Sequence, residues 1–209
     1  MKRSTTRALI ALALIASTVG GYGCAALSQI GNLRNLQFQL GAVQGFRLNG
    51  VDISRISQPS DVSPMDMVRL GQAIATKTMP VEFTLNVNAR NPNTPTAGAQ
   101  PTPLYLSRLD WRLKIDGRET IAGVVNRQLE IPAGGQTTVI PLTMQLDLYK
   151  FFADRGLNDM INLATAIGGA RGSSSRLELL AKVQVTIPGI PTPINYPGEI
   201  SIVDRQFSN

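Results

Sequence analysis

The side chains that usually carry catalysis or hold metals are scarce in this chain and do not cluster. Among 209 residues there is no histidine, the commonest general base and metal ligand, and there is one cysteine, Cys24. One cysteine forms neither an intramolecular disulfide nor a cysteine-based metal cluster. The carboxylates are scattered singly, and a glycine break separates Asp154 from Asp159. We therefore expect no enzymatic activity, no catalytic residues, no cofactor and no metal site.

Basic side chains concentrate around one predicted hairpin, at Arg108, Arg112, Lys114 and Arg118. One interpretation is a solvated sheet face whose charges oppose edge-to-edge aggregation. The other is contact with anionic headgroups or lipopolysaccharide at a membrane surface. Both interpretations stay open from the sequence.

The overall charge does not indicate a nucleic-acid partner. The formal net charge is +6. Lys2, Arg3 and Arg7 precede Cys24, while every acidic residue follows it, so the surplus after Cys24 is only about three positive charges. A nucleic-acid-binding domain usually carries a much stronger basic footprint.

The N-terminal segment has the three parts of an export signal. A short basic region, 1–7, precedes twelve apolar residues, 8–19. Twelve residues are too few to span a bilayer, which needs about 20, and they fit the apolar region of a signal peptide. Gly23 and Cys24 follow, an arrangement that resembles the lipobox of bacterial lipoproteins. The alternative is an ordinary export signal with an incidental cysteine.

The lipobox resemblance implies the processing and location of the protein. It implies that residues 1–23 are cleaved, that Cys24 carries acyl chains, and that 24–35 tether the domain to a membrane. Ala25 is not the Asp that retains many lipoproteins at the inner membrane, so the outer membrane facing the periplasm is expected in a two-membrane cell. Gly21 and Tyr22 depart from the usual pattern of Leu and a small residue.

The remaining chain has the alternating pattern of half-buried strands. Residues 81–90 alternate apolar and polar side chains without interruption. The Asp116-Gly117 pair is a hairpin signal, and Gly41 is expected to mark a bulge. Further alternating segments lie at 36–48, 111–115, 140–146, 177–187 and 200–202.

Two helices are predicted within this pattern. Ser63, Pro64 and Asp66 form a helix start, and the helix is expected to run to about Thr78. Its predicted core-facing stripe contains Met67, Leu70 and Ile74, with Val68 and Ala75 beside it. A second helical stretch covers about 148–167 and is broken near Gly156. These features predict a mainly β fold, an antiparallel fibronectin-like or immunoglobulin-like β-sandwich with two helical insertions.

The order of motifs in 81–132 resembles that of type 2 late embryogenesis abundant proteins, which carry the water-stress and hypersensitive-response domain. The alternating strand ends at Asn91-Pro92-Asn93, another strand pair has a Gly turn, and Pro132-Ala133-Gly134 precedes a further strand. The resemblance covers about 36–204 and leaves 205–209 as a tail. It implies a fibronectin-like sandwich with roles in desiccation and stress tolerance and without catalysis. A Pro-rich insertion at 94–103 and the helix at 63–78 depart from the family.

The Asn91-Pro92-Asn93 motif is expected to have a structural role. Asn side chains bond nearby backbone groups in turns, and Pro92 fixes the bend. Direct recognition of a ligand by Asn91 or Asn93 is the alternative.

Three functions remain open for the exported domain. The first is a membrane-anchored stress-protection protein that stabilises the envelope. The second is an interaction module that holds an envelope protein partner at the membrane. The third is a carrier of a lipid or another apolar ligand, which requires an apolar pocket. An exposed apolar patch would indicate a partner-binding surface, whereas simple stress protection predicts none.

Overall fold

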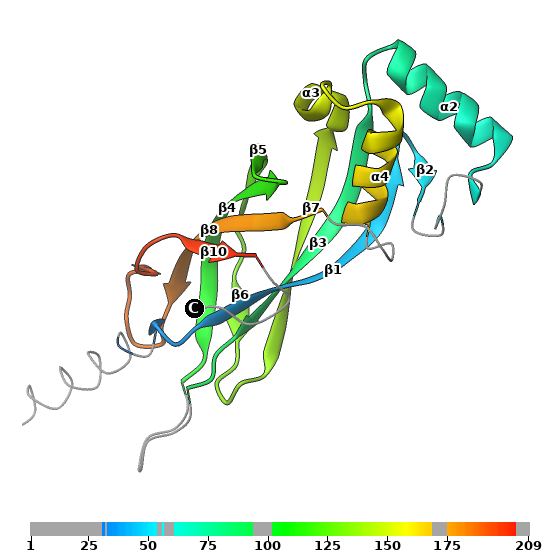
Figure 1. The fold of residues 1–209 in the computed structure, drawn as a ribbon. Helices are drawn as coiled ribbons and strands as arrows, with labels where there is room; N and C mark the ends of the chain where they lie inside the picture. The colour runs from blue at the N-terminus through cyan, green and yellow to red at the C-terminus, as the bar shows by residue number, and fades with distance from the viewer. Residues whose placement is uncertain are drawn as a thin grey trace, which may run out of the picture.

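The computed structural model describes residues 31, 33–53, 56, 61–93, 102–168 and 175–203. The predicted signal peptide, the predicted lipid-attachment residue Cys24, most of the Pro-rich insertion 94–103 and the tail 205–209 lie outside these residues. Figure 1 shows two β-sheets and a group of helices at one end.

The first sheet contains four antiparallel strands in the order β2-β1-β3-β7. Its strands are β1 (Gln37–Leu48), β2 (Val51–Asp52), β3 (Pro80–Arg90) and β7 (Thr137–Asp147). Every second side chain of β3 is buried, from Val81 to Ala89, because successive residues of a strand point to opposite faces of the sheet.

The second sheet has the order β10-β8-β4-β5, with two short strands attached to β4 and β8. Its residues are β4 (Leu104–Ile115), β5 (Arg118–Val125), β6 (Leu129–Ile131), β8 (Leu177–Thr186), β9 (Ile194–Asn195) and β10 (Ile200–Ile202). β4 and β5 are joined by Asp116 and Gly117, both with positive φ, which is the geometry of a type I′ hairpin turn.

The inner faces of the two sheets form one hydrophobic core. Phe38 from the first sheet and Leu113 from the second are fully buried. The predicted bulge at Gly41 is confirmed by a register shift between Leu40 and Val43 in the β1–β3 ladder. A Cβ at Gly41 would lie 3.1 Å from both Cβ and the carbonyl oxygen of Asn86, so a larger residue would crowd the neighbouring strand.

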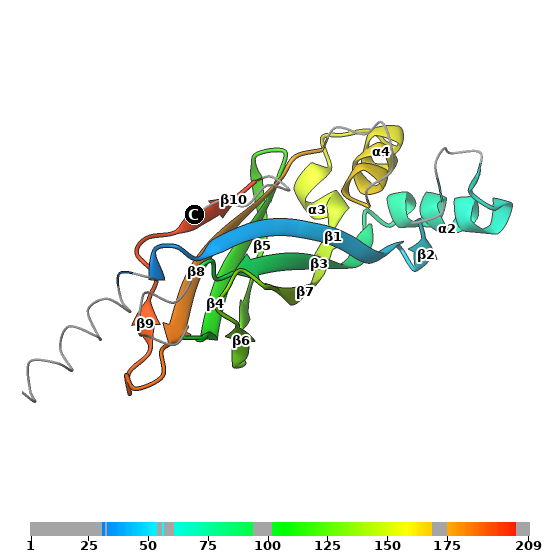
Figure 2. The same ribbon diagram turned by 90° about the horizontal axis from the view of Figure 1, so that it is seen from below.

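The helices lie together at one end of the first sheet (Figures 1 and 2). The predicted broken helix is two helices, α3 (Leu148–Phe152) and α4 (Leu157–Ile167), which connect β7 to β8. The other helix, α2 (Pro64–Ala75), connects β2 to β3. The prediction of a mainly β antiparallel sandwich with helical insertions is therefore confirmed.

The α2 helix differs from its prediction at its C-terminus and on its apolar face. It ends at Ala75 because Lys77 has a φ of 55° and Thr78 donates its N–H to the Ala73 carbonyl at 2.8 Å, a Schellman-type ending. The predicted core stripe was wrong for Met67, which is exposed, as is Val68 beside it.

Candidate functional site

The Asn91-Pro92-Asn93 motif connects four segments of the fold. Asn91 is fully buried; its side-chain oxygen accepts from the Asn93 N–H at 3.2 Å, and its amide donates to the Thr102 carbonyl. The turn at Gly134 and Gly135 donates two backbone N–H groups to the carbonyls of Asn93 and Asn91. The Asn93 side chain also accepts from the Asn35 amide at 2.8 Å. These contacts give both asparagines structural roles in a turn.

Each of the four basic residues singled out in the sequence has a carboxylate partner. Arg108 forms a two-point ion pair with Asp110, with distances of 2.8 and 2.7 Å. Arg118 binds Asp154 at 2.6 Å and also donates to the Phe151 carbonyl. These two pairs neutralise the ends of the cluster.

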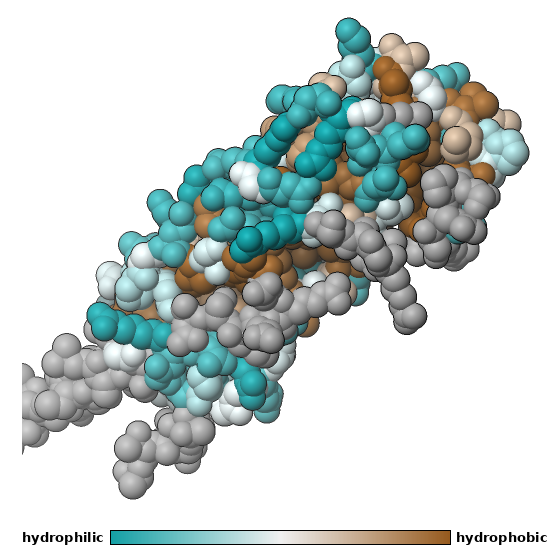
Figure 3. Space-filling view, in the orientation of Figure 1, coloured by the Kyte–Doolittle hydropathy of each residue, from teal (hydrophilic) through white to brown (hydrophobic). Residues whose placement is uncertain are grey.

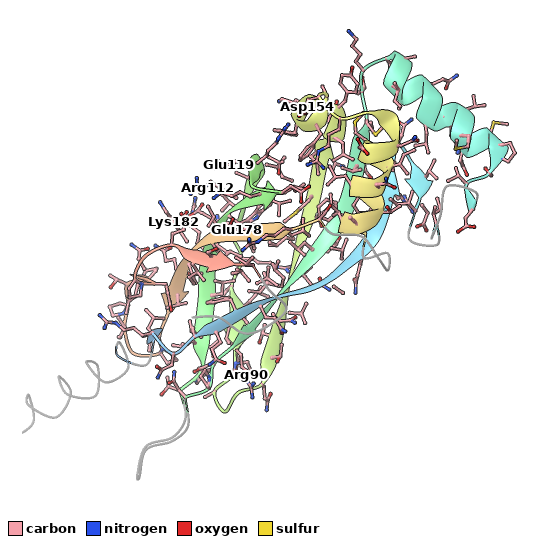
Figure 4. The ribbon with its side chains drawn as sticks, in the orientation of Figure 1. Arg90, Arg112, Glu119, Asp154, Glu178 and Lys182 are labelled. Atoms are coloured by element: carbon pink, nitrogen blue, oxygen red, sulfur yellow. The ribbon has the colours of Figure 1, made fainter. Side chains whose placement is uncertain are left out.

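The two central cations are paired across strands. Arg112 bridges Glu119 at 3.1 Å and Glu199 at 2.8 Å, and Lys114 lies 3.9 Å from Glu178. Figure 4 shows Arg112, Glu119, Glu178 and Lys182 on the second-sheet side of the molecule, with Arg90 far from them. The face is therefore an alternating array of charges, which does not favour contact with an anionic membrane.

The ion pairs shift the protonation of three carboxylates. Hydrogen bonds from Arg108, Arg118 and Arg112 lower the pKa values of Asp110, Asp154 and Glu199, respectively. Lys182 adds a weaker electrostatic effect on Asp110 and Glu199. All three carboxylates are therefore ionised at neutral pH and keep their arginine partners.

Two shallow hollows lie beside β5. The larger has a volume of about 570 Å³ and lies over Leu180, Ala122 and Val124, with charged residues at its margin. The smaller, of about 390 Å³, lies between the end of β5 and the middle of β7. Both are open depressions of the surface.

Trp111 contributes to both hollows although it is 7% exposed. Its indole occupies the position where a Cβ of Gly123 would lie on the neighbouring strand. Gly123 is needed here because any side chain would displace the indole. Trp111 is therefore part of the core.

An apolar surface lies at the α2 end of the molecule. Met65 is 66% exposed, Met67 44% and Val68 56%, and these are three of the five large apolar side chains with high exposure among the described residues. At about 100° per residue, one face of α2 carries five exposed residues with no charge. They are Pro64, Met67, Val68, Gly71 and Ala75. Figure 3 shows hydrophobic residues gathered at this end, whereas the second-sheet side is mostly hydrophilic.

The attachment of α2 to the body depends on few contacts. Leu70 and Ala73 are its buried residues, and Ile74 is half-buried. The Asn49 amide donates to the Arg69 carbonyl at 3.0 Å. Ser63 caps the first turn by accepting from the Asp66 N–H at 3.2 Å, as the sequence predicted. The helix is thus well formed but covered on one side.

Other kinds of site are not seen in the described part of the chain. Within residues 31–203, apart from the gaps given above, no three or more Asp, Glu or Cys side chains are arranged to hold a metal ion. No described helix is long and apolar enough to cross a bilayer.

Comparisons with known proteins give no family. No protein-family model matches the chain, and no curated protein is significantly similar to it. One solved structure, described as the crystal structure of a protein from Archaeoglobus fulgidus, aligns with 80% of this chain and 99% of its own. Its identity is 12% and its TM-score is 0.31.

Sequence reasoning missed the exposure of α2. The exposed stripe has the same helical spacing as a buried one, and spacing alone does not show which face a neighbour covers. One signal was available: at about 100° per residue, the apolar side chains of α2 extend from Leu70 through Met67 to Val68, an arc wider than the usual apolar stripe of a surface helix. Asp66, Arg69 and Gln72 share the opposite side.

Proposed function

We propose that this protein is a non-catalytic interaction module, tethered to a membrane through Cys24, that presents α2 to a protein partner in the cell envelope. The observation that carries the proposal is the exposed face of α2 that has no charge, on which Met67 and Val68 lie with Pro64, Gly71 and Ala75. Contiguous apolar surface of this kind marks protein–protein contact sites in soluble domains.

The position of α2 suits a tethered adaptor. The first described residues, just before β1, lie at the end of the molecule opposite α2 in both ribbon views (Figures 1 and 2). β1 runs between these ends, and twelve strand residues span about 40 Å at about 3.3 Å each. A lipid anchor preceding β1 would therefore hold α2 well away from the membrane that carries it.

The charge pairing on the second sheet favours a protein partner over a lipid. The cations that could have bound headgroups are already engaged by Asp110, Asp154, Glu178 and Glu199. The two hollows beside β5 are shallow and have charged residues at their margins, so they do not supply the closed apolar pocket that a lipid carrier needs.

A stress-protection role is the second candidate, and the fold favours it. The resemblance to type 2 late embryogenesis abundant proteins implies a β-sandwich, and the described residues form one. Under this function the α2 face would have no specific occupant. The two functions therefore predict different effects of replacing exposed apolar residues of α2 with charged ones: only the adaptor function predicts the loss of a bound protein.

The test is cross-linking of the native lipoprotein in its membrane, followed by purification through a tag after Asn209. The adaptor function predicts one stoichiometric protein that is lost when Met67→Asp and Val68→Asp are combined. Val139→Asp is the matched control, because Val139 on β7 is 50% exposed and lies far along the chain from α2. Cys24→Ala should release the partner together with the module.

Two results would contradict the adaptor function. One is recovery of no stoichiometric protein. The other is a partner retained equally by the wild type and the α2 double variant. If, in addition, deletion of the gene reduced survival of drying and the double variant restored it, stress protection would be the better function.

A further inference from the structure

The strand β5 has an open hydrogen-bonding edge. It is an outer strand of the second sheet, paired on one side with β4. Apart from that ladder, residues 121–127 make no hydrogen bond or ion pair with any described residue. Its backbone N–H and C=O groups that point away from β4 are therefore available to another strand.

The other outer strands of the sandwich are protected by features that β5 lacks. β2 has two residues and β10 has three, too short to template a further strand. β7 is long, but Pro141 in its middle has no N–H to donate. β5 has eight residues, without Pro or Lys, and exposes Ala122 and Val124 on its outer face.

We propose that β5 pairs antiparallel with β5 of a second copy of this chain, about a two-fold axis at Gly123. Opposite residues of an antiparallel ladder direct their backbone groups toward each other. When a strand pairs with its own copy, the two-fold axis must therefore pass through a residue that lies opposite its own copy. An axis between two residues would place an inward-pointing residue opposite an outward-pointing one. The two second sheets then join into one continuous sheet.

The register centred on Gly123 matches apolar and charged side chains. It places Ile121 opposite Val125 of the second copy and Ala122 opposite Val124. Glu119 and Arg127 fall opposite each other at both ends of the ladder. Glu119 also pairs with Arg112 of its own copy at 3.1 Å, whereas Arg127 has no carboxylate partner among the described residues of its own copy. Registers centred on Ile121 or Ala122 leave Arg127 without a carboxylate partner. They also place Arg118 in the ladder, although Arg118 already bonds the Phe151 carbonyl and the Asp154 carboxylate.

Gly123 suits the centre of this interface. Gly123 has no side chain to clash at the crossing point, and the Trp111 indole already fills the space where its Cβ would lie. Val124 is 51% exposed in the single copy. In the dimer it lies opposite Ala122 of the second copy, which covers it. The proposal does not depend on the function assigned to α2.

The experiment measures the mass of the full chain in a large excess of detergent micelles, by light scattering and sedimentation. We expect a dimer. Ala122→Lys with Val124→Lys puts lysines opposite each other twice and should weaken dimerisation about a hundredfold, since like charges that face each other across an interface repel. Ala122→Glu with Val124→Lys puts Glu opposite Lys and should restore the dimer. Val139→Lys, on β7, should leave it unchanged.

Circular dichroism and thermal unfolding of each variant confirm folding, which exposed positions 122 and 124 should preserve. A wild-type chain that stays monomeric at about 100 µM would overturn the proposal, because its dissociation constant would then exceed that concentration. A dimer that survives the two lysines would show that another surface mediates it. Failure of the Glu–Lys combination to restore the dimer would overturn the register at Gly123.

Discussion

The helices α2 and α4 have similar lengths, both are amphipathic by sequence, and the structure uses them in opposite ways. α4 buries five apolar side chains against the end of the first sheet: Met160, Ile161, Leu163, Ala164 and Ile167. α2 buries Leu70 and Ala73 and leaves Met65, Met67 and Val68 exposed. The comparison shows that α4 belongs to the core, whereas α2 is a surface element on which several apolar residues are exposed.

The largest expected effect is a loss of core packing in α4. Ile167→Ala should lower the free energy of unfolding by about 2–5 kcal/mol, because Ile167 is 2% exposed and its removal leaves a cavity. Urea unfolding followed by circular dichroism measures the change. A loss below about 1 kcal/mol would mean that α4 is as loosely attached as α2.

Leu70→Ala in α2 should have a smaller and more local effect. Because α2 can separate without exposing the sandwich core, the cost is limited to the docking free energy of the helix, about 2 kcal/mol. Hydrogen exchange should accelerate in 64–75 while the amides of β3 stay protected. Equal acceleration in both segments would show that α2 and the sandwich unfold as one unit.

Removal of the helix cap tests whether α2 depends on local interactions. Ser63→Ala should destabilise the helix by about 1 kcal/mol, because the Asp66 N–H loses its acceptor. We expect faster exchange in the first turn of α2 and little change in the melting temperature. Ser63→Asp, which keeps an acceptor at the cap, is the matched control and should exchange as the wild type does.

Substitution of the outer face of α2 should have almost no effect on stability. Met67→Ser and Val68→Ser should change the free energy of unfolding by about 0.5 kcal/mol or less, because both side chains are already in water. Thermal unfolding checks this result. A large loss would mean that these side chains are covered in the native protein in solution.

The smallest expected effect is a loss of folding stability at acidic pH. Asp154 has an ordinary pKa of 3.8 that the hydrogen bond from Arg118 lowers. A lowered pKa in the folded state contributes stability that is present above the ordinary value and is lost as the pH falls through the folded value. Stability should therefore decrease slightly below about pH 4, less so in high salt because the pair is exposed. Asp154→Asn should remove this part of the dependence.

The strands were predictable because burial on one face leaves a period of two in the sequence. Val81 to Ala89 and Ile140 to Leu146 have this pattern, and both are strands. Ser63 likewise marked the beginning of α2, because capping depends on local chemistry, and Gly156 marked the break between α3 and α4. These features are encoded within a few neighbouring residues.

Features that depend on distant contacts were not predictable. Arg112 binds Glu199, which is 87 residues away, and Arg118 binds Asp154, 36 residues away. The cluster of cations in the sequence therefore gave no indication of its neutralisation. The open edge of β5 depends in the same way on the strand order, which the residues of 118–125 do not specify.

Trp111 has a consequence for spectroscopy. It is the single tryptophan of the chain, so its fluorescence comes from one position, where the indole rests on Gly123 beneath the open edge of β5. Emission of an indole shifts with the polarity of its surroundings. Any event that covers this edge should therefore shift the emission to shorter wavelength without an added label, while events at α2 should leave it unchanged. The native protein thus contains an optical reporter that distinguishes its two candidate contact surfaces.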